Sequence, residues 1–139
     1  MAKKAHSRRA FLATISGGLV AAMSAAIPKN VRASVPHPDP RPEIDSSKVM
    51  TREQLKGWPE DVIATYDKVR EIPQIADGIG CNCACYVRPN YRSLLTCYYP
   101  DGMARGCEIC QGEAKLVYRR YKEGQTLDQI RRAIDARFG

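Results

Sequence analysis

Six cysteines are the residues of this 139-residue chain with the clearest capacity for chemistry, and all of them lie between positions 81 and 110. Cys81, Cys83 and Cys85 alternate with other residues, and Cys97 stands alone. Cys107 and Cys110 are three positions apart. In extended backbone, side chains at every second position project to one face, so the first three thiols should line one edge. Thiolates are soft ligands that select Cu(I), zinc or iron–sulfur clusters.

The cysteine spacings favour two of these metals. A tetrahedral zinc site could take two thiolates from each end of the window, whereas closely packed Cys-x-Cys pairs suit Cu(I), with the thioether of Met103 nearby. No familiar iron–sulfur spacing is present, and Gln111 rather than histidine follows Cys110, which excludes c-type haem attachment. Copper or zinc is therefore the expected cofactor, with all six thiols as candidate ligands.

Two other interpretations of the cysteines stay open. An even number of cysteines in a small exported domain also fits a disulfide framework, in which the three clustered thiols would pair with Cys97, Cys107 and Cys110. Alternatively, Cys107-Glu-Ile-Cys110 at a helix start could exchange thiols and disulfides, because a helix N-terminus favours the thiolate. The βαβ context that usually accompanies such a redox motif is missing.

The N-terminal segment has the pattern of an export signal. Residues 7–12 read Ser-Arg-Arg-Ala-Phe-Leu and resemble the twin-arginine translocation signal. The apolar stretch 13–27 is too short for a confident membrane span, which needs ~20 residues, and Val31-Arg32-Ala33 offers a small-x-small cleavage site. We expect residues 1–33 to be a signal peptide that directs the chain to the periplasm or cell exterior, with membrane attachment only if it stays uncleaved.

Charge and composition exclude several functional classes. The formal charge of +7 arises mostly from the first 33 residues, which hold six basic residues and no acid. The remainder is nearly neutral, which argues against a nucleic-acid-binding domain. The chain also has no credible nucleophile–histidine pair, no paired-carboxylate motif and no glycine-rich phosphate loop. We therefore expect neither an enzyme nor a small-molecule substrate.

The rest of the chain divides into a linker and a helical domain. Four prolines alternate between positions 36 and 42, which favours polyproline II, so residues 34–50 are expected to be a Pro-rich spacer. Helical signals begin at Thr51, with a capping box to Gln54. After Pro59, a stripe of apolar residues predicts a helix that ends before Pro73, with Trp58 as a core or helix-corner residue.

Three further segments complete the predicted domain, residues 51–139. Residues 91–98 could form two helical turns, and residues 107–122 form a helix with a stripe at Cys110, Ala114, Val117 and Tyr121. A last helix opens with the capping box Thr126-x-x-Gln129, and Arg131 should lie on its solvated face. The predicted fold class is all-α, a small bundle of three to four short helices around a Cys-rich loop.

The cysteine blocks also resemble a known family. Gly80-Cys81-Asn82-Cys83-Ala84-Cys85 is similar to a Pro-Cys-Tyr-Cys-Gly-Cys signature, and the blocks 91–98 and 101–110 are similar to two further family blocks. The chain thus resembles the PCYCGC-motif family of small exported bacterial proteins and lipoproteins of unknown function. All six cysteines match positions in these blocks, but the resemblance implies no activity.

Together these observations predict an exported Cys-rich protein that binds Cu(I) or zinc through thiolates. Its expected partners are the metal ion and a protein of the cell envelope, with no nucleic acid. The alternative from the same residues is a disulfide-stapled structural or interaction module with no metal.

Overall fold

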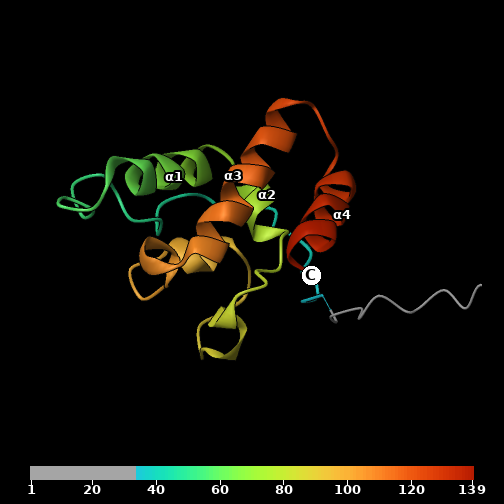
Figure 1. Ribbon diagram of the computed structural model, residues 1–139, viewed down its shortest axis with the longest axis horizontal. Coiled ribbons are helices and arrows are strands. Elements are labelled where there is room, and N and C mark those ends of the chain that lie inside the picture. The colour runs from blue at the N-terminus through green and yellow to red at the C-terminus, as the bar shows by residue number, and fades with distance from the viewer. Residues whose placement is uncertain (1–33) are drawn as a thin grey trace, which may run out of the picture.

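The computed structural model describes residues 34–139, and its regular secondary structure in that range is all helical, with no strand (Figure 1). The helices are α1 (Glu60–Glu71), α2 (Pro73–Asp77), α3 (Glu108–Lys122) and α4 (Leu127–Phe138). Three short 3₁₀ helices lie between α2 and α3: η1 (Ala84–Val87), η2 (Leu95–Tyr98) and η3 (Ala104–Gly106). The prediction of a small all-α fold is confirmed. The expected signal peptide lies outside the described residues.

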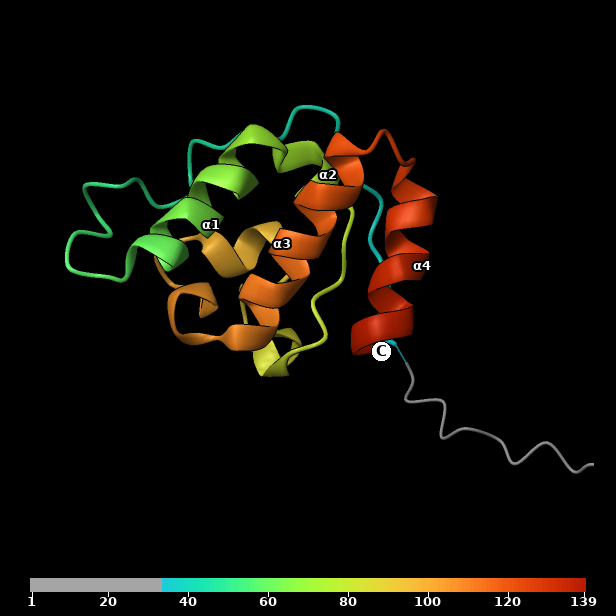
Figure 2. The same cartoon turned by 45° about the horizontal axis from the view of Figure 1, so that its top comes forward.

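Helix α3 occupies the middle of the domain, between α1 and α4 (Figures 1 and 2). The segment between α2 and α3, which carries most of the cysteines, runs beneath these helices in Figure 1, and its loop that contains η1 projects away from them. The core is continuous, and its aromatic centre is an edge-to-face contact between Tyr66 and Tyr98, whose ring centroids lie 4.6 Å apart. Within residues 34–139, no helix combines the length and the apolar character that crossing a membrane requires.

Helix α1 follows its sequence signals closely. Pro59 precedes its first turn, Glu60 and Asp61 lie at the positive end of the helix dipole, and the apolar stripe is buried. Two expectations nearby need correction. Trp58 lies at the corner just before α1, but it is 41% exposed and is not a core residue. The capping bonds of Thr51 close a succession of turns instead of starting a helix.

Helices α3 and α4 form an antiparallel pair joined by a short turn. Gly124 adopts a φ of +79° after α3, a conformation that glycine tolerates best, and α3 ends at Lys122, the predicted boundary. The predicted capping box then starts α4, with Thr126 and Gln129 bonding each other's backbone. Val117, Ile130 and Ile134 are buried, but Tyr121 at the end of the predicted stripe is 43% exposed.

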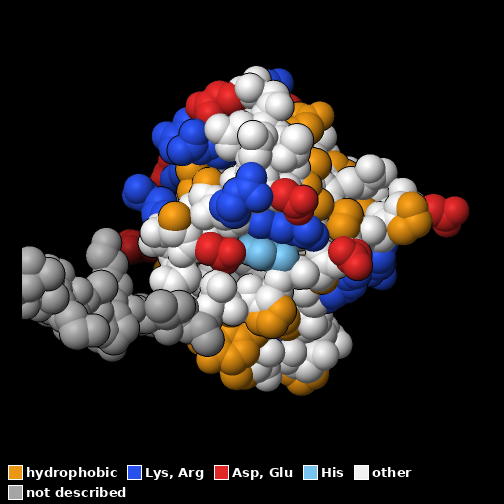
Figure 3. Space-filling view, turned by 90° about the vertical axis from the view of Figure 1, so that its right-hand side faces the viewer, with side chains coloured by type: hydrophobic (Ala, Val, Ile, Leu, Met, Phe, Trp, Pro, Cys, Tyr) orange, Lys and Arg blue, Asp and Glu red, His pale blue; other side chains and the backbone are white. Residues whose placement is uncertain are grey.

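Residues 34–50, here called the N-terminal strap, pack on the domain instead of forming a free spacer. The backbone N–H of Val35 donates to Asn82 Oδ1 at 3.1 Å. His37 Nδ1 accepts the N–H of Gly80 at 2.9 Å, so its Nε2 carries the proton and faces Asp135 Oδ1 at 3.1 Å. Figure 3 shows the histidine of the described residues in pale blue at the surface, beside acidic side chains. Arg131, expected on a solvated face, instead donates to the carbonyl oxygens of Pro38 and Gly78.

The contact between the strap and the Cys loop yields a stability prediction. A Cβ on Gly80 would lie 2.5 Å from the Pro36 carbonyl oxygen, so Gly80→Ala must push the strap away. We expect the variant to lose ~1–3 kcal/mol of unfolding free energy, measured by urea titration. The matched control is Gly106→Ala, because a Cβ there meets no heavy atom within 4 Å. An equal loss in both variants would refute the role of the strap contact.

Candidate metal centre

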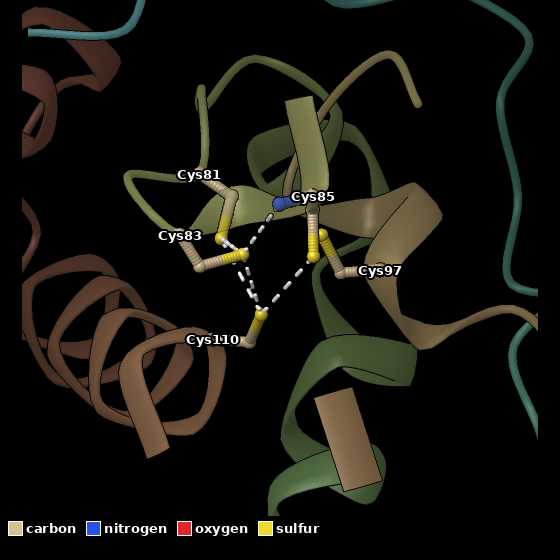
Figure 4. Close-up of side chains that lie close together, drawn as sticks. All are labelled: Cys81, Cys83, Cys85, Cys97 and Cys110. Carbon is tan, nitrogen blue, oxygen red and sulfur yellow. Dashed lines mark hydrogen bonds between the residues drawn. The ribbon is translucent and has the colours of Figure 1, made fainter. Parts of the chain in front are cut away.

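Five buried thiols converge at one end of α3 (Figure 4). Their sulfur atoms all lie within 4.8 Å of one another, and we refer to them as the five-thiol group: Cys81, Cys83, Cys85, Cys97 and Cys110. The sulfur of Cys110 is central, at 3.5, 3.3 and 3.7 Å from those of Cys81, Cys83 and Cys85. Cys81 and Cys83 are 3.3 Å apart.

Four separate pieces of the fold supply these sulfurs. Cys81 and Cys83 precede η1, while Cys85 lies within it and its N–H donates to Cys83 Sγ at 3.2 Å. Cys97 comes from η2 and Cys110 from the first turn of α3. The prediction that the three alternating thiols gather on one edge agrees with this arrangement, although η1 rather than extended backbone carries the third.

Cys107 lies outside the five-thiol group. It is the N-cap of α3, and its Sγ accepts the N–H of Cys110 at 3.4 Å. A helix start was expected to favour the Cys107 thiolate, but burial raises the pKa of Cys107 to about 12. The two cysteines of the Cys-x-x-Cys pair therefore differ in role here, one capping the helix and the other facing the sulfur cluster.

Two tyrosines, one partly buried and one fully buried, bond the backbone beside the sulfurs. The Tyr91 hydroxyl accepts the N–H of Cys81 at 2.7 Å. The Tyr98 hydroxyl, fully buried, donates to the Cys110 carbonyl oxygen at 2.9 Å. Sequence reasoning missed both roles, because each bond joins residues more than nine positions apart and no local pattern encodes it.

Glu113 is a buried carboxylate one turn after Cys110. Its Oε1 accepts two bonds from Asn82, at 2.8 Å from the backbone N–H and 3.1 Å from the side-chain amide. Its Oε2 has no hydrogen-bond partner among the described residues. Burial raises the pKa of Glu113 to about 7, although bonds from the Cys81 thiol and Asn82 oppose that shift. An acid on the same helix face as Cys110 and Val117 was the sequence signal that could have identified it.

The thiols of the group polarise one another. Hydrogen bonding from Cys110 and then Cys81 lowers the pKa of Cys83, and bonding from Cys81 and then Cys97 lowers the pKa of Cys85 to about 4. The pKa values of Cys81 and Cys97 are raised, in both cases first by their bonds to Cys110. Neighbouring S–H donors therefore favour the thiolate form of Cys83 and of Cys85, although a charge on Cys83 opposes ionisation of Cys85.

Comparison with known proteins supplies no relative. No family model, curated protein or solved structure matches the chain. The resemblance drawn from the cysteine blocks stays a prediction, and function has to be argued from the geometry of the site.

The donor set limits what the site can bind. The group could hold a metal ion, and every one of its donors is sulfur. Buried soft donors match soft or borderline metals and are poor ligands for Mg²⁺ or Ca²⁺, which require oxygen. The separations of 3.3–3.7 Å are also close to the ~3.8 Å edge of a tetrahedron with ~2.3 Å metal–sulfur bonds.

Proposed function

We propose that this chain is an exported, non-enzymatic metal-binding protein whose five-thiol group holds Cu(I). The observation that carries the proposal is the convergence of five buried sulfurs within 4.8 Å, with no imidazole in the set. Thiolates bind Cu(I) well because both partners are soft and polarizable. Export to the periplasm or cell exterior rests on the twin-arginine pattern at Arg8 and Arg9.

The number of sulfurs favours Cu(I) over zinc. A closed structural zinc site takes four ligands in a tetrahedron, so a fifth thiol at the same distance would have no position around a single ion. Cu(I) accepts two or three thiolates and shares them between ions, so five sulfurs can serve a small cluster. Zinc bound by four of the five thiolates is the runner-up for the same group.

The number of clustered thiols does not fit the disulfide alternative. A framework of three bridges needs all six cysteines, yet Cys107 caps α3 outside the group. Pairing within the group would leave one of five thiols unpaired. The sulfur separations, 3.3 Å or more for the close pairs, also exceed the ~2.05 Å of a bonded pair. These observations favour metal binding over a stapled module.

Intact mass and metal content on one sample test the proposal. The chain should be exported by its own signal and purified without chelator or reductant, then weighed under native and denaturing conditions. We expect a denatured mass equal to that of the fully reduced chain, together with stoichiometric copper. A denatured mass about six hydrogens lower without metal would establish three disulfides instead, and stoichiometric zinc would replace copper as the physiological ion.

A further inference from the structure

A surface cavity of about 170 Å³ reaches the five-thiol group from one side. Its inner wall includes Cys85 and Cys97, whose sulfurs lie next to each other in Figure 4, and Met103 also lines it. Asn90 and Asp101 lie at its rim, where the Asn90 amide donates to the Asp101 carboxylate at 2.9 Å. The cavity volume far exceeds the ~10–15 Å³ that one water needs, so a metal ion with a small ligand fits inside.

The sulfurs differ in burial along this cavity. Cys85 and Cys97 are each 2% exposed, whereas Met103 is half-buried. Two other surface cavities, one beside the strap and η2 and one beside the C-terminus, are lined by no sulfur. Among these three cavities, only the one lined by Cys85 and Cys97 connects solvent to the five-thiol group, and the soft thioether of Met103 also lines it.

We propose that this cavity is the port through which Cu(I) reaches the five-thiol group, and that the Met103 thioether is its first ligand in the port. The inference rests on the proposed function and adds a route to it. A neutral thioether binds Cu(I) without losing a proton and more weakly than a thiolate does, so it can take the ion and release it inward. Cys85 and Cys97 are the next donors along the path.

The transfer is an exchange of ligands with no redox change. A bond from copper to its carrier breaks as the bond to Met103 Sδ forms, and that bond breaks in turn as copper–thiolate bonds form at Cys85 and Cys97. Each thiol that becomes a ligand gives its proton to solvent, and copper remains Cu(I) throughout. The carrier leaves with the electron pair that it had shared with the ion.

The port is tested by the rate of copper uptake rather than by its extent. Reduced, copper-free full-length protein would be mixed anaerobically with a coloured Cu(I)–chelator complex. The loss of colour would be followed by stopped flow. Met103→Leu keeps the volume and removes the soft donor, and we expect its uptake rate constant to be about tenfold lower, or ~1.4 kcal/mol in the barrier. Met50→Leu is the matched control, because Met50 is buried outside the cavity.

A second pair of variants tests the opening itself. Asn90→Trp should cover the rim and slow uptake to a similar degree, whereas Asn90→Ala, which loses only the bond to Asp101, should not. Unchanged copper stoichiometry and equilibrium affinity in all four variants are part of the expected result. Wild-type rates in Met103→Leu or in Asn90→Trp would overturn the port while leaving the copper site intact. No copper uptake by the wild-type protein would refute the proposed function instead.

Discussion

If the five-thiol group holds copper as proposed, we expect Cys110→Ser to lower the copper content more than any other single cysteine replacement. Cys110 is the central sulfur, within 3.7 Å of three others, and it is fully buried. Loss of an outer-shell partner already lowers metal affinity 10–100-fold in other sites, so loss of this ligand should reach ~100-fold or more. Copper per chain at saturation and affinity by competition with a chelator are the two measurements.

Cys107→Ser is the control for that experiment, since it changes the same residue type three positions earlier in the chain. Cys107 caps α3 outside the five-thiol group, and serine is a favoured N-cap whose hydroxyl can accept the N–H of Cys110. We expect wild-type copper content and a melting temperature at or above that of the wild type. Equal copper losses in the two variants would mean that Cys107 is a ligand and that the metal-bound group is larger than five.

The helices could be predicted because their signals are local. The stripe of Val62, Tyr66 and Val69 repeats with the period of a helix, and these residues are buried. Thr126 and Gln129 cap α4 through bonds that span only three positions. Such patterns depend on neighbours in sequence, so the sequence contains all the information that they need.

The same local rule fails where bonding partners are distant. Four prolines in 36–42 correctly indicated a segment without helix, but nothing in those residues names the partners that hold it down. His37 bonds Gly80, 43 positions away, and faces Asp135, 98 positions away. Trp58 shows the converse, because a large apolar side chain predicts burial, yet Trp58 is 41% exposed.

The sequence predicted that cysteines form the candidate site, but not which of the six belong to it. Cysteine type and clustering indicated a thiolate site, and period two indicated that Cys81, Cys83 and Cys85 would face the same way. Whether Cys107 or Cys110 would join them depends on the rotation of α3 about its axis, which the packing of that helix against α1 and α4 sets. An i, i+3 spacing could not distinguish the residue that caps the helix from the one that faces the cluster.

The largest loss of stability is expected from Asp77→Asn. The Asp77 carboxylate is fully buried at the end of α2, where the Arg41 guanidinium donates to it at 2.8 and 3.0 Å. Ser93 donates at 2.9 Å, and the Arg92 guanidinium lies 3.1 Å away. These bonds join the strap, α2 and the segment before η2 at one buried charge. The Arg41 and Arg92 side chains left behind are 42% and 34% exposed and stay hydrated, so removing that charge should cost ~2–3 kcal/mol of unfolding free energy.

Acid should reduce that difference, and the sign follows from the pKa of Asp77. Burial alone would raise it, but the bonds from Arg41 and Ser93 outweigh burial and hold the pKa below its ordinary value. A lowered folded-state pKa contributes stability at pH values above the unfolded-state pKa of ~4, and this stability is lost as pH falls through the folded-state pKa.

The free energies of unfolding of wild type and Asp77→Asn, measured by urea titration, should therefore differ more at pH 7 than at pH 2–3. Asp128→Asn, an exposed partner of Arg131, should stay close to wild type at both. A difference between wild type and Asp77→Asn that does not change with pH would show that the lost acceptor oxygen rather than the charge matters, because the amide has nearly the same volume as the carboxylate but one acceptor oxygen instead of two.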